Sequence, residues 1–130
     1  ESVENRDFDA IEHEMATIAD FCRERGITDK VIVEMCKLDG DDAAKRRVCE
    51  IALEAKPGFL KTSTGRSFGG AKLQDVQLMR EVLGDAVAIK AAGGIHNYEE
   101  ALAFIEAGAS ALGASAGIAI VEGAPEDERR

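Results

Sequence analysis

Residues 86–108 read AVAIKAAGGIHNYEEALAFIEAG, a segment whose periodicity changes in the middle. Its first five residues alternate small and branched apolar side chains and end on Lys90, which predicts a buried strand. A loop with two glycines follows, and Asn97 with Glu100 predicts the capped start of a helix that Gly108 closes. This order of strand, glycine loop and capped helix predicts one β-α unit of a parallel sheet.

Similar units occur on both sides of this segment. The predicted fold is therefore α/β, with four parallel strands, flanking helices and right-handed crossovers. Strands are expected at 30–35, 59–62, 86–90 and 111–113, and helices at 8–26, 41–55, 73–83, 97–108 and 116–121.

Four strands suit either a small doubly wound sheet or part of a (β/α)8 barrel. A full barrel needs about 250 residues, and this chain of 130 residues supplies about half of that. We expect residues 1–123 to form a partial barrel domain. The acidic residues 124–130 are predicted to be a disordered tail.

The composition is that of a globular protein with one core, 45% hydrophobic and 32% charged. The net charge of −9 argues against a nucleic-acid partner, which needs a basic surface. No apolar run reaches the roughly 18 residues of a membrane span, and the acidic N-terminus does not resemble a signal peptide. Three cysteines without a C-x-x-C pair predict reduced thiols and a cytoplasmic protein.

Two consecutive predicted strands end on lysine, Lys61 in GFLKTSTG and Lys90 in AVAIK. A single lysine at a strand end usually reaches into solvent. Sites in parallel sheets form at these ends, so we expect the two amines to lie close together. A second cation in a poorly hydrated site lowers the pKa of a lysine, and a neutral lysine attacks a carbonyl to form a Schiff base.

Two glycine-containing loops predict an anion site beside the lysines. Gly93-Gly94 follows the third strand, and residues 113–117 follow the last one. Either loop alone is equally well a simple tight turn. Loops before helix N-termini also expose backbone N–H groups that bind anions. Together with the lysines, they predict a phosphorylated carbonyl substrate.

The segments KVIVEMC, FLKTSTG and AIKAAGGIHNYEEALAFIEAGASALGASAG resemble the deoxyribose-phosphate aldolase family in content, order and spacing. The resemblance runs from about Asp7 to Gly117. It implies the C-terminal half of a (β/α)8 barrel. It also implies a class I aldolase, without metal or other cofactor, that reversibly cleaves 2-deoxy-D-ribose 5-phosphate to acetaldehyde and D-glyceraldehyde 3-phosphate.

By this resemblance, Lys61 is the Schiff-base lysine and Lys90 is the second lysine that lowers its pKa. His96 stands where the family usually has arginine, and the family's catalytic aspartate belongs to a strand upstream of Glu1. We therefore expect little or no activity from the isolated chain, and self-association or pairing with an N-terminal half. The residues implied around the substrate phosphate are Thr64, Gly65, Gly93, Gly94, Gly113 and Ser115.

Two other hypotheses remain open. The chain is alternatively another lysine-dependent sugar-phosphate aldolase of the same barrel class, or a non-catalytic half-barrel that binds anions or pairs with another chain. Glu34, at the end of the first strand, suits a structural ion pair with Lys61 or Lys90 as well as it suits a catalytic role.

Overall fold

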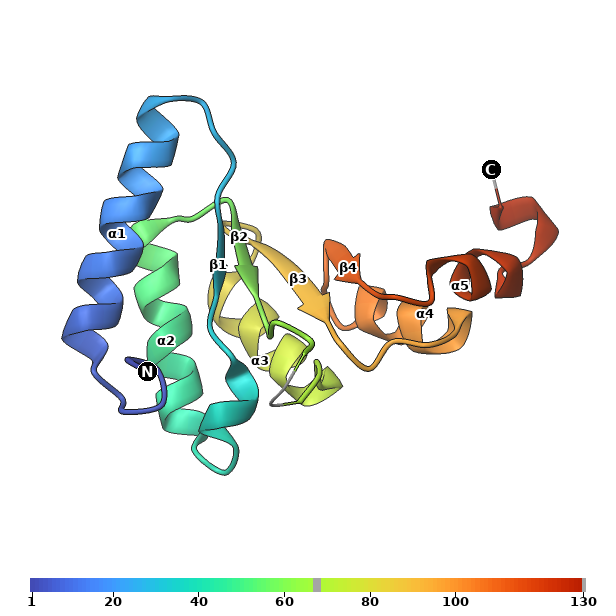
Figure 1. Cartoon of the computed structure of the whole chain (residues 1–130), viewed down its shortest axis with the longest axis horizontal. Coiled ribbons are helices and arrows are strands. Elements are labelled where there is room, and N and C mark those ends of the chain that lie inside the picture. The colour runs from blue at the N-terminus through green and yellow to red at the C-terminus, as the bar shows by residue number, and fades with distance from the viewer. Residues whose placement is uncertain (67–68, 130) are drawn as a thin grey trace.

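Four parallel strands lie side by side in chain order and form one open sheet (Figure 1). The structure is a computed structural model that describes residues 1–66 and 69–129. The strands are β1 (Lys30–Ile32), β2 (Phe59–Lys61), β3 (Ala88–Ala92) and β4 (Ala111–Gly113). Four parallel strands were predicted, and this is confirmed. The strand order never reverses, as it would in a doubly wound sheet.

The helices alternate with the strands after a first helix that precedes β1, and the last two lie side by side at the end of the chain (Figure 1). Three of them begin at a side-chain cap, in which Asp7, Asp41 or Asn97 accepts a hydrogen bond from a backbone N–H three residues on. Within the described ranges, no helix combines the length and the apolar character needed to cross a membrane. The helices are α1 (Phe8–Glu24), α2 (Asp42–Ala55), α3 (Leu73–Leu83), α4 (Tyr98–Glu106) and α5 (Gly117–Gly123), with 3-10 turns η1 (Met35–Leu38) and η2 (Glu126–Glu128).

Burial alternates along the strands and divides the sheet into a covered and an open face. Leu60 and Ile89 are fully buried in the core between the sheet and the helices. Phe59, Lys61 and Lys90 point to the other face and are only half-buried. In a closed barrel, such a face lines the interior. Here it is the open face of the sheet.

Several element boundaries differ from those predicted. β3 includes Ala91 and Ala92, which were expected to be loop, because both stay paired with β4. β1 ends at Ile32 instead of Met35, because Glu34 adopts a left-handed backbone with φ 45°. Ile18 lies on the predicted apolar stripe of α1 but is 51% exposed, so this stripe is not buried along its whole length.

The three cysteines are free thiols. Burial, followed by the nearby charge of Asp75, raises the pKa of Cys49 to about 12. Burial also raises the pKa of Cys36, with smaller contributions from the charges of Glu34 and Asp39. These two thiols are therefore protonated at neutral pH and are poor nucleophiles.

The described part of the predicted tail contains the short turn η2. Arg129 donates hydrogen bonds to the carbonyl oxygens of Ala124 and Glu122, each at 2.6 Å. Arg130 lies outside the described residues. Disorder of residues 124–130 stays a prediction.

A buried ion pair joins α2 to α3. Lys45 Nζ lies 2.6 Å from Asp75 Oδ1, and both side chains are only 6% exposed. Asp39, in the turn after η1, is a second partner of Lys45 at 3.1 Å and also pairs with Lys72. Burial lowers the pKa of Lys45, but the hydrogen bonds and charges of Asp75 and Asp39 outweigh it and raise the pKa above its ordinary value. This pair links the first turn of α3 to α2.

We predict that Asp75→Ala lowers the free energy of unfolding by about 3 kcal/mol, because it leaves the buried charge of Lys45 with one half-exposed partner. Urea denaturation at neutral pH measures this loss. The matched control is Glu81→Ala, which removes the exposed Arg46–Glu81 pair between the same two helices. It should cost less than about 1 kcal/mol. Equal losses in the two variants would show that the buried pair has no special weight.

Candidate active site

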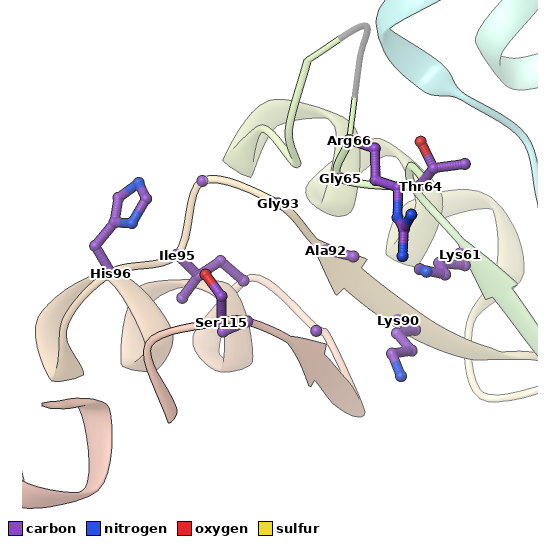
Figure 2. Close-up of a pocket in the computed structure, with 13 residues that line it drawn as sticks. Lys61, Thr64, Gly65, Arg66, Lys90, Ala92, Gly93, Ile95, His96 and Ser115 are labelled. Carbon is purple, nitrogen blue, oxygen red and sulfur yellow. The ribbon is translucent and has the colours of Figure 1, made fainter. Parts of the chain in front are cut away.

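A cleft of about 470 Å³ lies at the C-terminal ends of β2, β3 and β4 (Figure 2). All eight residues predicted for the site line it, and they come from these three strands and the loops that follow them. The lining residues are Lys61, Thr64, Gly65, Arg66, Lys90, Ala92, Gly93, Gly94, Ile95, His96, Gly113, Ala114 and Ser115. The structure thus brings the predicted residues together, while their chemical roles stay predictions.

Lys61 and Lys90 are direct partners in the parallel ladder between β2 and β3. Both lie on the open face at the floor of the cleft (Figure 2). Neither amine forms an ion pair with an acidic residue in the described part of the chain. An ion pair of Glu34 with one of them, one of the two roles left open for Glu34, is therefore not formed. The Glu34 carboxylate instead accepts a hydrogen bond from the backbone N–H of Thr64.

The hydroxyl residues after Lys61 have two different environments. Thr62 and Ser63 are buried, and they tie the end of β2 to β3. Ser63 Oγ donates to the carbonyl of Ala92 at 2.5 Å, and the N–H of Ala92 donates to Thr62 Oγ1 at 3.2 Å. Thr64 is exposed and lines the cleft. Sequence reasoning gave Thr62 and Ser63 no role, although buried hydroxyls need hydrogen-bond partners.

Glycines let the loops after β2 and β3 touch backbone to backbone. Gly93 has φ 86°, and a Cβ there would lie 2.8 Å from Gly65 Cα and 3.0 Å from Gly70 Cα. A Cβ on Gly70 would lie 2.5 Å from the carbonyl oxygen of Gly93. No side chain fits at these points, so bare backbone forms this wall of the cleft.

Side chains of the same segment already accept hydrogen bonds from two backbone N–H groups at the N-terminus of α4. Asn97 Oδ1 accepts from the N–H of Glu100 at 2.9 Å, as a cap should. Glu100 Oε2 accepts from the N–H of His96 at 2.7 Å, one residue before the position a standard capping box uses. Because these two amides are occupied, an anion in the cleft depends more on other donors and on cationic side chains.

Arg66 is a cleft residue that sequence reasoning missed. It follows Gly65, and its guanidinium reaches toward Lys61 (Figure 2). It has no hydrogen bond or ion pair among the described residues. With Lys61 and Lys90 it gives the cleft three cationic side chains and no acidic one among its described lining residues. The available signal was a third basic residue five positions after Lys61.

Metal binding has no obvious ligand set in the part of the chain that the structure describes. There, no group of three or more His, Cys, Asp or Glu side chains lies close enough to hold an ion. The absence of a cofactor requirement stays a prediction.

Comparison with known proteins supplies close relatives, although no family model matches the chain. The chain is 45% identical over 126 residues to a deoxyribose-phosphate aldolase of Thermococcus kodakarensis, covering 97% of this chain and 55% of the relative. It is 46% identical over 123 residues to the enzyme of that name from Enterococcus faecalis, covering 95% and 54%.

Solved structures agree with these relatives. A putative deoxyribose-phosphate aldolase from Coccidioides immitis superposes with a TM-score of 0.81 at 29% identity, covering 93% of this chain and 47% of that one. An aldolase called QR15 superposes with a TM-score of 0.78 at 34% identity, covering 93% and 53%.

The four consecutive parallel strands and these neighbours define the fold as half of a (β/α)8 barrel of the aldolase class. Sequence and structure together place the chain in the deoxyribose-phosphate aldolase family. The chain spans about half the length of the curated relatives it matches. The predicted fold class and family are thereby confirmed.

We predict that Gly93→Ala is far more damaging than Gly94→Ala. Both glycines have positive φ, so alanine is strained at either position, by about 1 kcal/mol. Only at position 93 does the new Cβ also meet backbone atoms, whereas nothing lies within 4 Å at position 94. Urea unfolding should therefore show a loss for Gly93→Ala at least about 2 kcal/mol larger. Similar losses for the two variants would contradict the backbone contact between the loops.

Proposed function

We propose that this chain is the catalytic half of a class I deoxyribose-phosphate aldolase, which cleaves 2-deoxy-D-ribose 5-phosphate reversibly to acetaldehyde and D-glyceraldehyde 3-phosphate. The observation that carries the proposal is the pairing of Lys61 with Lys90 at the floor of a cationic cleft with glycine walls. The names of the sequence relatives support the choice of substrate.

In this proposal Lys61 is the nucleophile. Its neutral amine adds to the aldehyde carbon of the open-chain sugar, and loss of water gives a Schiff base. A base then removes the proton of the C3 hydroxyl while the protonated imine draws the electrons of the breaking C2–C3 bond, which releases D-glyceraldehyde 3-phosphate and leaves an enamine. Protonation of the enamine and hydrolysis release acetaldehyde and regenerate the amine.

Lys90 and the loops have supporting roles in this scheme. Lys90 is the adjacent cation that repels a second positive charge on its neighbour. Arg66 supplies charge for the phosphate, because guanidinium groups suit phosphate recognition. The neutral residues of the phosphate site are Thr64, Gly65, Gly93, Gly94, Gly113 and Ser115, which line the same cleft.

The cleft lacks one component that the chemistry requires. No carboxylate lines it among the described residues, so the group that protonates the enamine must come from elsewhere. We therefore propose that the open face, with Ile32 41% exposed, pairs with an N-terminal half-barrel that supplies this group. The same observation favours a second hypothesis, in which the chain is a non-catalytic half-barrel that only binds anions.

Reductive trapping tests the nucleophile. With acetaldehyde and sodium borohydride, we expect one ethyl group to be added to the chain, on Lys61, by peptide mass mapping. Lys61→Met should abolish this adduct. The matched control is Lys30→Met, since Lys30 lies on β1 of the same sheet and is exposed. Ethylation spread over several lysines, or lost in the control, would overturn the assignment.

Lys90→Met provides the second arm of this experiment. We expect the adduct on Lys61 to form at least about tenfold more slowly, because the neighbouring charge is gone. An unchanged rate would remove Lys90 from the proposed mechanism and leave Lys61 in place.

Pairing in trans tests the partner. The chain would be mixed with the N-terminal half of a family relative, and the complex followed by analytical ultracentrifugation and by release of acetaldehyde. A complex with turnover supports the aldolase proposal. A tight complex without turnover supports the non-catalytic hypothesis. Two separate species would contradict the proposed pairing of the open face.

A further inference from the structure

The end of β1 contains an irregularity centred on Glu34. The N–H of Val33 donates to the carbonyl of Lys61 at 3.1 Å, and the N–H of Met35 donates to the carbonyl of Thr62 at 2.8 Å. These two donors are two residues apart, but their acceptors are only one residue apart. In a regular parallel ladder, the acceptors would also be two residues apart. Glu34 is therefore the extra residue of a bulge, and its backbone is left-handed, at φ 45° and ψ 59°.

This bulge changes the direction of the Glu34 side chain. Strand alternation would place Glu34 on the open face with Ile32, beside Lys61. Instead, Oε1 accepts a hydrogen bond from the backbone N–H of Thr64. Oε2 is buried and has no hydrogen-bond partner among the described residues. A left-handed backbone and an unsatisfied buried oxygen are both unfavourable, and the contact with Thr64 is one of the interactions that offset them.

The bond to Thr64 holds the loop after β2 from the side opposite to β3. Ser63 bonds to Ala92 of β3, and Thr64 bonds to Glu34 beyond β1. Because these two hydrogen bonds are made by consecutive residues, the start of the loop has little conformational freedom. The side chain of Thr64 and the next residue, Gly65, line the cleft directly after this restrained amide.

We propose that Glu34 is a positioning residue for the anion site. Its charge fixes the amide of Thr64, because a hydrogen bond donated to a carboxylate is about twice as strong as one donated to a neutral acceptor. The fixed amide aims the Thr64 side chain and the Gly65 backbone into the cleft. Glu34 itself does not line the cleft. The inference rests on the proposed function only in taking the ligand of the cleft to be a phosphate group.

Two variants separate the carboxylate from the backbone strain. Glu34→Asn tolerates the left-handed backbone but is one methylene too short to reach Thr64. Glu34→Gln keeps the length and loses the charge. The probe is inorganic phosphate, with its dissociation constant measured by calorimetry. We expect Glu34→Asn to resist urea at least as well as the unsubstituted chain, yet to bind phosphate about tenfold more weakly. The phosphate affinity of Glu34→Gln should lie between those of Glu34→Asn and the unsubstituted chain.

The adduct on Lys61 with acetaldehyde distinguishes this inference from the proposed function. Acetaldehyde carries no phosphate, so its trapping should be unchanged in both variants. Equal phosphate affinity in all three proteins, or no phosphate binding by the unsubstituted chain, would overturn the positioning role. Absence of any adduct on Lys61 would overturn the aldolase proposal and leave the phosphate comparison valid.

The amide proton of Thr64 gives a direct measurement. A bond to a carboxylate should place its NMR resonance far downfield in the unsubstituted chain, and it should move upfield in both variants. A resonance that stays in place when Glu34 is replaced would show that the contact does not exist in solution.

Discussion

The pairing of β2 with β3 is the constraint on which the whole site depends. It sets Leu60 opposite Ile89 in the core and therefore Lys61 opposite Lys90 on the open face. A slip of one residue would turn a lysine into the apolar layer and an apolar side chain out of it, so the register is strongly specified. The buried Leu60 and Ile89 thus fix the lysine pair more firmly than any contact between the lysines could.

The same junction continues beyond the strands. Ser63 bonds to Ala92, and the bare backbone of Gly65 meets that of Gly93 directly afterwards. The two loops consequently behave as one unit. The pairing of β2 with β3 therefore positions both the Lys61 amine at the floor of the cleft and the glycine wall of the cleft. Glu34 extends this unit to β1 through its bond to Thr64. Three strands thereby share one network at the cleft.

Most of the fold follows from local patterns, and most of what was missed depends on distant contacts. The bounds of α3 and β4 match those predicted because apolar spacing and breaking residues are local. The predicted site residues meet in one cleft because the sheet register follows from the same pattern. The bulge at Glu34 depends on a backbone amide thirty residues later, which no local pattern contains.

Exposure on the helices shows a different limit of sequence reasoning. Apolar spacing predicts which side of a helix is able to pack, but burial requires a partner on that side. Met15 of α1 is 2% exposed, whereas Ile18, one turn further along the same apolar stripe, is 51% exposed. Arg66 was missed for a related reason, since its place in the cleft depends on the direction the chain takes after Gly65.

The hydration of the open face links closure of the sheet to the chemistry of the lysines. Two lysine side chains that lie side by side without an acidic partner are more easily tolerated while water reaches them, because water screens the repulsion between like charges. A second half-barrel over this face would remove that water, and removal of water disfavours the charged form of an amine. A neutral nucleophile is what Schiff-base formation needs. The open half-barrel therefore holds the lysine pair in position, and covering this face is expected to raise the rate of Schiff-base formation at Lys61 above that of the open chain.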